Sequence, residues 1–259
     1  MTGRCEAITS RPARANGEAF TLLELLVVLG IIACLLGMLI PSFLGAMDLA
    51  YFVQCENNHR QLIQAMANYM VENNDYYTFP NWLWPETAGW WKGPGWLYDF
   101  TNLQNGHHNY VLKDLEAGAL WQYVRRYDTY RCPAETEPYN RGPSNHITSY
   151  LMNGAVTNYG HYPQGKVVLY RMMDMLRKQG SEAVLIWEAH EDWGSYWNDG
   201  SSTPNQGLTD RHGNGATVGL VDGHTDWISL DDYDAELARR PGRLWCNPGA
   251  RDGRYQFHD

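Results

Sequence analysis

Histidine and carboxylate side chains gather in the last third of the sequence, and their types suit metal binding. His212 lies ten residues before Asp222, and Glu188 and Asp192 come a little earlier in the chain. Imidazole with carboxylate suits zinc or another transition metal, whereas carboxylates with carbonyls suit calcium. The alternative is that His212 and Asp222 only hydrogen-bond loop backbone and close a hairpin. Both interpretations stay open.

The sequence does not assemble the parts of a catalytic site. A hydrolase needs a nucleophile or activated water, a base and an oxyanion stabiliser in one cleft. The chain has no G-x-S-x-G, no HExxH and no phosphate-cradling loop motif. One His near one Asp is too common to indicate a catalytic pair. We therefore expect a protein that is not an enzyme and that requires no cofactor.

Aromatic side chains are concentrated between residues 76 and 98, where nine of 23 residues are Phe, Trp or Tyr. Prolines and glycines in this segment exclude a regular helix. Exposed Trp side chains could stack on sugars or form subunit contacts. The alternative is that they form the small core of an irregular loop. The candidates for ligand or subunit contact are Trp82, Trp84, Trp90, Trp91 and Trp96.

A long apolar helix must carry the start of the chain. Residues 20–40 form a run of 21 residues with a single charge, Glu24. At about 1.5 Å per residue this run spans roughly 30 Å, the thickness of the hydrocarbon core of a bilayer. Apolar residues then recur at three- and four-residue spacing, so one helix is predicted over 20–73, with 20–40 in the membrane. Basic residues prevail in 1–19, which keeps this end in the cytoplasm and places the rest outside it.

The remaining residues, 74–259, are predicted to form one globular α+β head. We expect a small antiparallel sheet packed against the carboxyl half of the long helix, with long aromatic-rich loops. Asp222-Gly223-His224 is typical of a hairpin turn. The predicted strands are 167–170, 184–187, 216–221 and 225–228.

The residues around Phe20 resemble a known processing signal. Ala-Phe-Thr-Leu-Leu-Glu at 19–24 is similar to the prepilin-type cleavage and methylation motif of type IV pilins and type II secretion pseudopilins. The resemblance implies that a leader of residues 1–19 is removed by prepilin peptidase, between Ala19 and Phe20, and that Phe20 is methylated. Ala before the cut departs from the commoner Gly. A cut after Gly17 is the alternative.

The same resemblance gives Glu24 and Pro41 roles in assembly. A carboxylate in an apolar segment costs about 2.5 to 3.5 kcal/mol on insertion scales, so its presence needs a reason. After cleavage, Glu24 can pair with the free amino terminus of another subunit, which recovers part of that cost. In pilin-like filaments this pairing sets the axial register. Pro41 removes a helix hydrogen bond and can kink or locally melt the helix.

The head carries a second resemblance. His212 and Asp222-Gly223 match the H-x9-DG motif of a prepilin-associated family. Four further segments agree in order: CENNHRQLIQAMANYMVENNDYYTFP, YRCPAE, SYLMNG and SEAVLIWE. The resemblance implies a pilin-like or pseudopilin-like subunit. Some major pseudopilins bind calcium, which makes calcium the favoured ion for a site at Glu188, Asp192, His212 and Asp222.

Three of the five cysteines are expected in an oxidising compartment. Cys5 leaves with the leader and Cys34 lies in the apolar run, so Cys55, Cys132 and Cys246 remain. Disulfides persist outside the cytoplasm. A bridge between Cys55 and Cys132 is the first expectation, and one between Cys132 and Cys246 is the second.

Composition agrees with an exported head. The 259 residues include 20 basic and 29 acidic side chains, a net charge of −9, which argues against nucleic-acid binding. Without 1–19 the balance is 17 basic and 27 acidic side chains, a net charge of −10. The acidity therefore belongs to the exposed part of the chain.

We therefore predict a structural subunit of a type IV pilus-like or type II secretion pseudopilus-like filament. It would begin as a single-pass inner-membrane protein and end in a periplasmic or extracellular filament. Its expected partners are copies of itself in a helical filament, prepilin peptidase and an inner-membrane assembly platform. The alternative is a membrane-anchored pilin-like module that binds glycans or a secreted substrate and forms no bulk filament.

Overall fold

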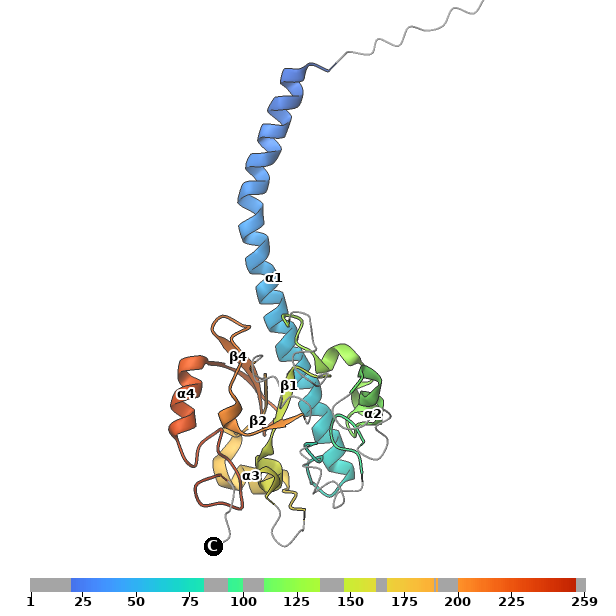
Figure 1. The fold of residues 1–259 in the computed structure, drawn as a ribbon, viewed down its shortest axis with the longest axis vertical. Coiled ribbons are helices and arrows are strands. Elements are labelled where there is room, and N and C mark those ends of the chain that lie inside the picture. The colour runs from blue at the N-terminus through green and yellow to red at the C-terminus, as the bar shows by residue number, and fades with distance from the viewer. Residues whose placement is uncertain are drawn as a thin grey trace, which may run out of the picture. The chain divides into compact units, whose positions relative to one another are not determined.

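The computed structural model describes residues 20–81, 93–99, 110–135, 147–161, 167–188, 190 and 200–254. By contacts the chain divides into two compact units, Met1–Ala46 and Met47–Asp259. Figure 1 shows the order of the elements. The helices are α1 (Leu22–Glu72), α2 (Trp121–Val124), α3 (Met172–Gln179) and α4 (Leu230–Ala238), and the strands are β1 (Tyr150–Asn153), β2 (Val184–Glu188), β3 (Ser201–Ser202), β4 (Gly215–Leu220) and β5 (Thr225–Ser229).

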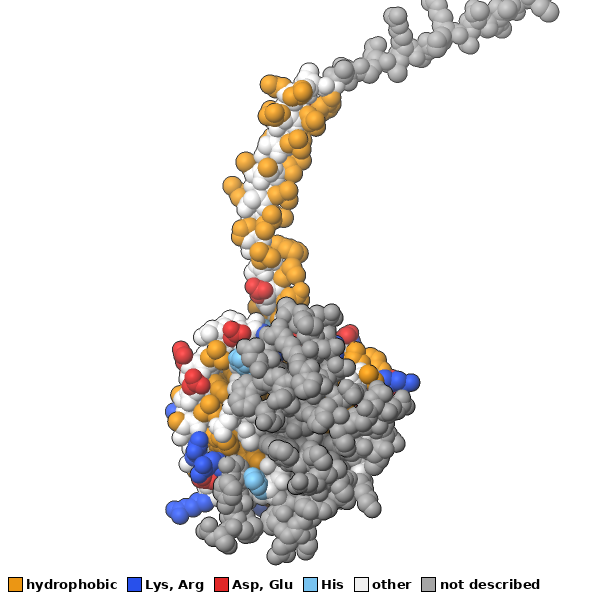
Figure 2. All heavy atoms as spheres, viewed as in Figure 1, with side chains coloured by type: hydrophobic (Ala, Val, Ile, Leu, Met, Phe, Trp, Pro, Cys, Tyr) orange, Lys and Arg blue, Asp and Glu red, His pale blue; other side chains and the backbone are white. Residues whose placement is uncertain are grey.

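The described part of the first unit is the amino-terminal half of α1. All residues from 20 to 46 are exposed, and Figure 2 shows hydrophobic side chains around the helix. An 18-residue window of α1 has a mean hydropathy of 2.8, so this helix is long and apolar enough to cross a membrane. Pro41 lies inside α1, and the helix continues through it without a break. The predicted long helix is confirmed, with Leu22–Glu72 in place of 20–73.

The carboxyl half of α1 is the central helix of the second unit. Its buried residues recur every three or four positions, which is the spacing of one helix face. Gly219 of β4 lies directly under this face, where an added Cβ would come within 2.4 Å of Ile63 Cδ1. The sheet therefore packs closely on α1. The buried residues of α1 are Cys55, Asn58, His59, Leu62, Ile63, Ala65, Met66 and Met70.

The five strands form one sheet in the order β3-β1-β2-β4-β5. The pairs β1–β2, β2–β4 and β4–β5 are antiparallel, and β4 and β5 form the predicted hairpin, with Gly223 at φ 100° in its turn. The sheet is mixed, however, because the two-residue strand β3 pairs with β1 in parallel. The expectation of a purely antiparallel sheet is corrected at this edge.

The two faces of the sheet have different coverings. Alternation along β2 sends Trp187 to one face, where it joins a core with Val218 and with Tyr233 of α4. Glu188 follows Trp187 and so faces the side covered by α1. The predicted strand at 167–170 is not formed. Tyr170 instead donates its N–H to the Val156 carbonyl and accepts from the Tyr77 N–H, so this stretch is an irregular link between elements.

Candidate functional site

The start of α1 carries a capping box that brings two signature residues together. The backbone N–H and hydroxyl of Thr21 donate to Glu24 Oε2 at 2.9 and 2.8 Å, and the Glu24 N–H donates to Thr21 Oγ1 at 3.2 Å. This reciprocal pattern satisfies two donors at the helix start. The Thr-x-x-Glu spacing before an apolar run was its signal in the sequence. Phe20 is exposed just before this cap, and Ala19 lies outside the described residues.

In the second unit, four ligand-bearing side chains converge in the buried interior. The Sγ atoms of Cys55 and Cys132, one carboxylate oxygen of Glu188 and one ring nitrogen of His212 all lie within 4.8 Å of one another. We call these four residues the Cys–His–Glu cluster. Each comes from a different part of the chain, and all four are buried.

Cys55 is placed by the buried face of α1. Its Sγ lies 3.1 Å from the hydroxyl of Tyr150 on β1. One turn further along the helix, Asn58 Nδ2 donates to the same hydroxyl at 3.1 Å. Because the hydroxyl oxygen accepts from Asn58, its own proton is free to point at sulfur. The helix spacing of three thus fixes both the thiol and its partner.

Cys132 sits in the segment that follows the turn Tyr127–Tyr130. Its backbone N–H donates to Ser149 Oγ at 2.7 Å, and Asn58 Nδ2 donates to the neighbouring Arg131 carbonyl at 2.9 Å. The segment is therefore tied to both α1 and the start of β1. The result is that Cys132 Sγ lies 3.4 Å from His212 Nε2.

Glu188 ends β2 and is held by the neighbouring strand. The register that pairs Trp187 with Val218 sets Glu188 beside Thr217. The Thr217 N–H and hydroxyl both donate to Glu188 Oε1, at 3.0 and 2.6 Å. Since the Thr217 hydroxyl proton is used there, the 2.8 Å contact between Thr217 Oγ1 and His59 Nδ1 has the imidazole as donor. A hydrogen-bond chain thus runs from His59 on α1 through Thr217 to Glu188.

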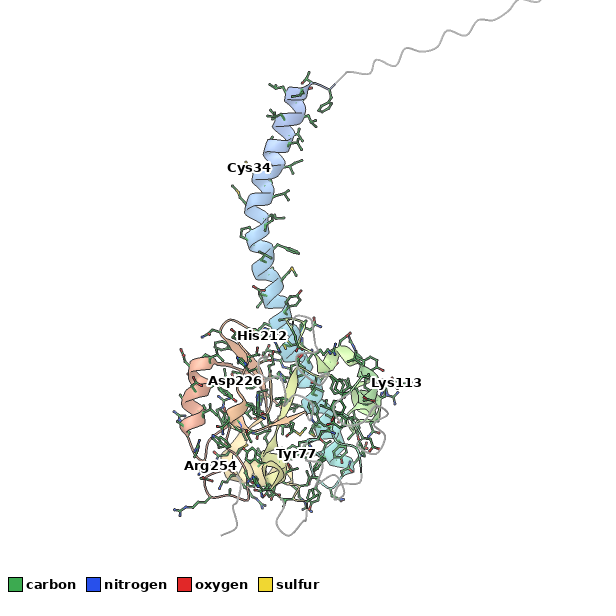
Figure 3. The ribbon with its side chains drawn as sticks, in the orientation of Figure 1. Cys34, Tyr77, Lys113, His212, Asp226 and Arg254 are labelled. Carbon is green, nitrogen blue, oxygen red and sulfur yellow. The ribbon has the colours of Figure 1, made fainter. Side chains whose placement is uncertain are left out.

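His212 is held by the tight turn before β4. Gly213 and Asn214 both have positive φ, at 69° and 62°, which lets the His212 N–H donate to the Gly215 carbonyl at 3.0 Å. The His212 carbonyl accepts from Trp227 Nε1 at 2.8 Å. Figure 3 shows His212 beside α1, where its ring packs edge-on against Phe52 with centroids 5.7 Å apart.

Charge is paired around the cluster. His212 Nε2 lies 3.3 Å from Glu188 Oε1, and the buried Arg211 guanidinium lies 3.7 Å from Glu188 Oε2 and 3.5 Å from Glu135 Oε1. Burial raises the pKa of Glu188, but the hydrogen bond and charge of His212 outweigh burial and lower this pKa to about 2. Burial lowers the pKa of His212, but its bonds to Cys132 and Glu188 raise it to about 9. Glu188 and His212 therefore form a buried ion pair when no metal is bound.

The surroundings shift the pKa values of the two thiols in opposite directions. Burial raises the pKa of Cys55, and its hydrogen bond to Cys132 adds to this. That same bond lowers the pKa of Cys132, and the bond to His212 lowers it further. Cys132 therefore has the greater thiolate character, while Cys55 acts as the donor.

The donor set differs from the one predicted. Glu188 and His212 meet as expected, but Asp222 lies in the β4–β5 turn, where its carboxylate accepts from the N–H of His224 at 3.1 Å and contacts His224 Nδ1 at 2.8 Å. Asp222 is corrected to a turn residue, as in the hairpin-closing alternative. Asp192 lies outside the described residues. Sulfur in place of these carboxylates favours zinc over calcium.

The structure does not contain the predicted disulfide. Cys55 and Cys132 are neighbours, yet both are free cysteines, as is Cys246. The physical reason is that their sulfurs turn toward hydroxyl and imidazole partners, Tyr150 and His212, as well as toward each other. In the sequence, the cysteines and the His–carboxylate group stand far apart and are two separate features. The missed signal was that Cys55 and His59 are four residues apart on the helix face expected to cover the sheet.

The aromatic candidates fall into two groups. Trp96 is fully buried, and its Nε1 donates to the Gly200 carbonyl at 2.9 Å. It is therefore a core residue, which corrects its assignment to ligand or subunit contact. Tyr77, Phe79 and Tyr98 are buried as well, in line with the small-core alternative. The other four candidates, Trp82, Trp84, Trp90 and Trp91, lie outside the described residues.

The geometry of the cluster does not suit nucleophilic catalysis. A Cys–His–acid triad needs the two imidazole nitrogens to serve different partners, one the nucleophile and one the acid. Here the same atom, His212 Nε2, faces both Cys132 Sγ and Glu188 Oε1. A thiol and a carboxylate that both contact one ring nitrogen can share its proton, or can bind one metal ion together with it.

The apolar, capped start of α1 and the α+β fold together define a pilin-like architecture. A family model described as the prokaryotic N-terminal methylation motif matches residues 14–40. The match supports a type IV pilin-like protein and suggests a prepilin-peptidase substrate such as a pilin or pseudopilin. No curated protein and no solved structure matches the chain.

Proposed function

We propose that this protein is a structural subunit of a type IV pilus-like or type II secretion pseudopilus-like filament, assembled through its amino-terminal helix. The observation that carries the proposal is the methylation motif at 14–40, together with a helix from Leu22 whose apolar side chains are exposed all round. A helix that is hydrophobic on every side needs lipid or other helices around it. Lipid surrounds the helix before assembly, and the helices of neighbouring subunits surround it afterwards.

Glu24 is the residue that distinguishes assembly from simple anchoring. An anchor gains nothing from a carboxylate in the bilayer, and it is the only charge between residues 20 and 40. In the proposed filament, Glu24 pairs with the Phe20 amino group of another subunit, which the cut after Ala19 creates. We further propose that the head is of the H-x9-DG type. His212 before β4 and Asp222 after it form the two ends of this motif.

Two variants on the same helix test the proposal. Glu24→Gln removes the charge in the apolar run, and Asp48→Asn removes the next charge along the helix, which is exposed and lies outside that run. We expect the Glu24→Gln chain to insert and be processed but to be missing from filaments sheared off the cells that make it. Asp48→Asn should give filaments like the unaltered chain. A normal filament yield from Glu24→Gln would overturn the assembly role.

The amino terminus gives an independent readout. Sequencing of the mature chain should begin at a methylated Phe20, whereas a start at Glu18 would place the cut after Gly17. A correctly processed chain that stays in the membrane and never enters filaments would instead favour the membrane-anchored binding module.

A further inference from the structure

We propose that the Cys–His–Glu cluster binds one zinc ion, as a structural site inside the second unit. The donor set is two sulfurs, one imidazole nitrogen and one carboxylate oxygen, all within 4.8 Å of one another. Four protein ligands and burial are the features of a closed structural zinc site. The proposal does not depend on filament formation, because all four residues belong to the second unit.

The distances fit a tetrahedral ion. Zinc binds nitrogen or oxygen at about 2.0–2.1 Å and sulfur at about 2.3 Å, so neighbouring ligand atoms of a tetrahedron lie about 3.3–3.8 Å apart. Cys132 Sγ and His212 Nε2 are 3.4 Å apart, and His212 Nε2 and Glu188 Oε1 are 3.3 Å apart. Both of these edges fall within that range, and the other pairs of ligand atoms lie within 4.8 Å of each other.

The surrounding hydrogen bonds are those of an oriented metal site. Ligand side chains in such sites are held by outer partners that fix their direction. Glu188 is held by the N–H and hydroxyl of Thr217, which in turn accepts from His59. Cys55 Sγ is met by the Tyr150 hydroxyl, and a donor at this distance stabilises a thiolate. Glu188 Oε2 accepts no hydrogen bond from the described residues but lies 3.7 Å from the Arg211 guanidinium, which leaves Oε1 beside His212 as the oxygen for an ion.

A disulfide between Cys55 and Cys132 is the main competitor for the same sulfurs. It would use two of the four groups and would leave unexplained why Glu188 and His212 converge on them. Zinc uses all four. Calcium is disfavoured because thiolate and imidazole are poor ligands for a hard cation. The ion would link four separate segments of the second unit: α1, the 131–135 segment, the end of β2 and the turn before β4.

The test uses the full chain in detergent, purified without chelator from cells that export it. We expect one zinc ion per chain by elemental analysis, and cysteine alkylation at Cys55 and Cys132 only after a chelator is added. Cobalt added to the chelated protein should give thiolate-to-metal charge-transfer bands and the visible bands of tetrahedral cobalt. These measurements need no variant, so they hold even if a variant fails to fold.

Matched variants then assign the ligands. Cys132→Ala should reduce the zinc content to background, whereas Cys246→Ala, which removes another buried free thiol, should leave it unchanged. Thr217→Val removes the hydroxyl that donates to Glu188 and accepts from His59, and should weaken zinc binding about tenfold to a hundredfold. Circular dichroism checks that each variant is folded.

Three results would overturn the proposal. The first is a Cys55–Cys132 disulfide in the exported protein, seen as a mass loss of two hydrogens and a linked peptide. The second is a reduced, folded chain that binds neither zinc nor cobalt. The third is zinc whose stoichiometry is the same in Cys132→Ala as in the unaltered chain, because such metal is held elsewhere.

Discussion

The buried ion pair between Glu188 and His212 makes a sharp prediction for the metal-free protein. In Glu188→Gln the side chain keeps its shape and can still accept the two hydrogen bonds from Thr217. It loses its charge, which leaves His212 and Arg211 without their shared carboxylate. Removing one partner of a buried pair costs about 3–5 kcal/mol because the other charge stays buried.

The size of the second unit converts this into a melting shift. The unit has 213 residues, Met47–Asp259, and an unfolding entropy of about 2.1 cal/mol/K per residue gives roughly 0.45 kcal/mol/K for the whole. A loss of about 3–5 kcal/mol therefore lowers the melting temperature by about 7–11 °C. The assay is thermal unfolding of the full chain in detergent, after treatment with chelator, followed by near-ultraviolet circular dichroism.

The matched control is Glu236→Gln, which breaks a pair at the surface whose Arg239 partner is exposed. Glu236 Oε1 lies 2.8 Å from Arg239 Nη1, whose side chain is 70% exposed, so the expected loss is below about 1 kcal/mol. The control loss should shrink further in high salt, whereas the Glu188→Gln loss should not. If both variants melt within the same few degrees, the carboxylate of Glu188 is not paired with buried cations and the account of the cluster fails.

Two more predictions concern the neighbours of the cluster. Burial lowers the pKa of His59 to about 4, so below pH 6.5 the unfolded chain takes up a proton that the folded chain does not. Stability is therefore lost as pH falls from about 6.5 to 4, by about 3 kcal/mol, and His59→Gln should remove this part of the pH dependence in denaturant titrations of metal-free protein. If the His59→Gln variant and the unaltered protein lose the same stability between pH 6.5 and 4, this prediction is wrong. Gly219→Ala places a Cβ 2.4 Å from Ile63 Cδ1 and should cost about 1–3 kcal/mol in the same titrations. A stability unchanged by Gly219→Ala would show that α1 does not pack closely on β4.

The larger elements follow from local patterns in the sequence. The apolar run from Phe20 and the three- and four-residue spacing beyond it predict α1, because helix periodicity is set within a few residues. Asp222-Gly223-His224 predicts the β4–β5 hairpin for the same reason. The parallel pairing of Ser201–Ser202 with β1 could not be predicted, since two residues carry no periodicity and the pairing spans a long stretch of chain.

The Cys–His–Glu cluster was predicted only in halves. Glu188 with His212 and Cys55 with Cys132 were each expected to be neighbours, on separate grounds. Joining them requires knowing that Glu188 and Thr217 face α1, which depends on the register between β2 and β4. A shift of one residue would turn Glu188 to the opposite face of the sheet, and no local pattern fixes that register.

Under the proposed function, the capping box at Thr21 also bears on the interval between processing and assembly. Both hydrogen bonds from Thr21 end on Glu24 Oε2, within the same chain and downstream of the cut, so removal of the leader leaves them intact. A carboxylate already supplied with donors is less costly to keep in lipid than a bare one. A processed subunit can therefore wait in the bilayer as a monomer with its charge locally solvated by its own helix end. When the subunit enters the filament, the Glu24 carboxylate then exchanges its hydrogen bonds from Thr21 for the Phe20 amino group of another subunit.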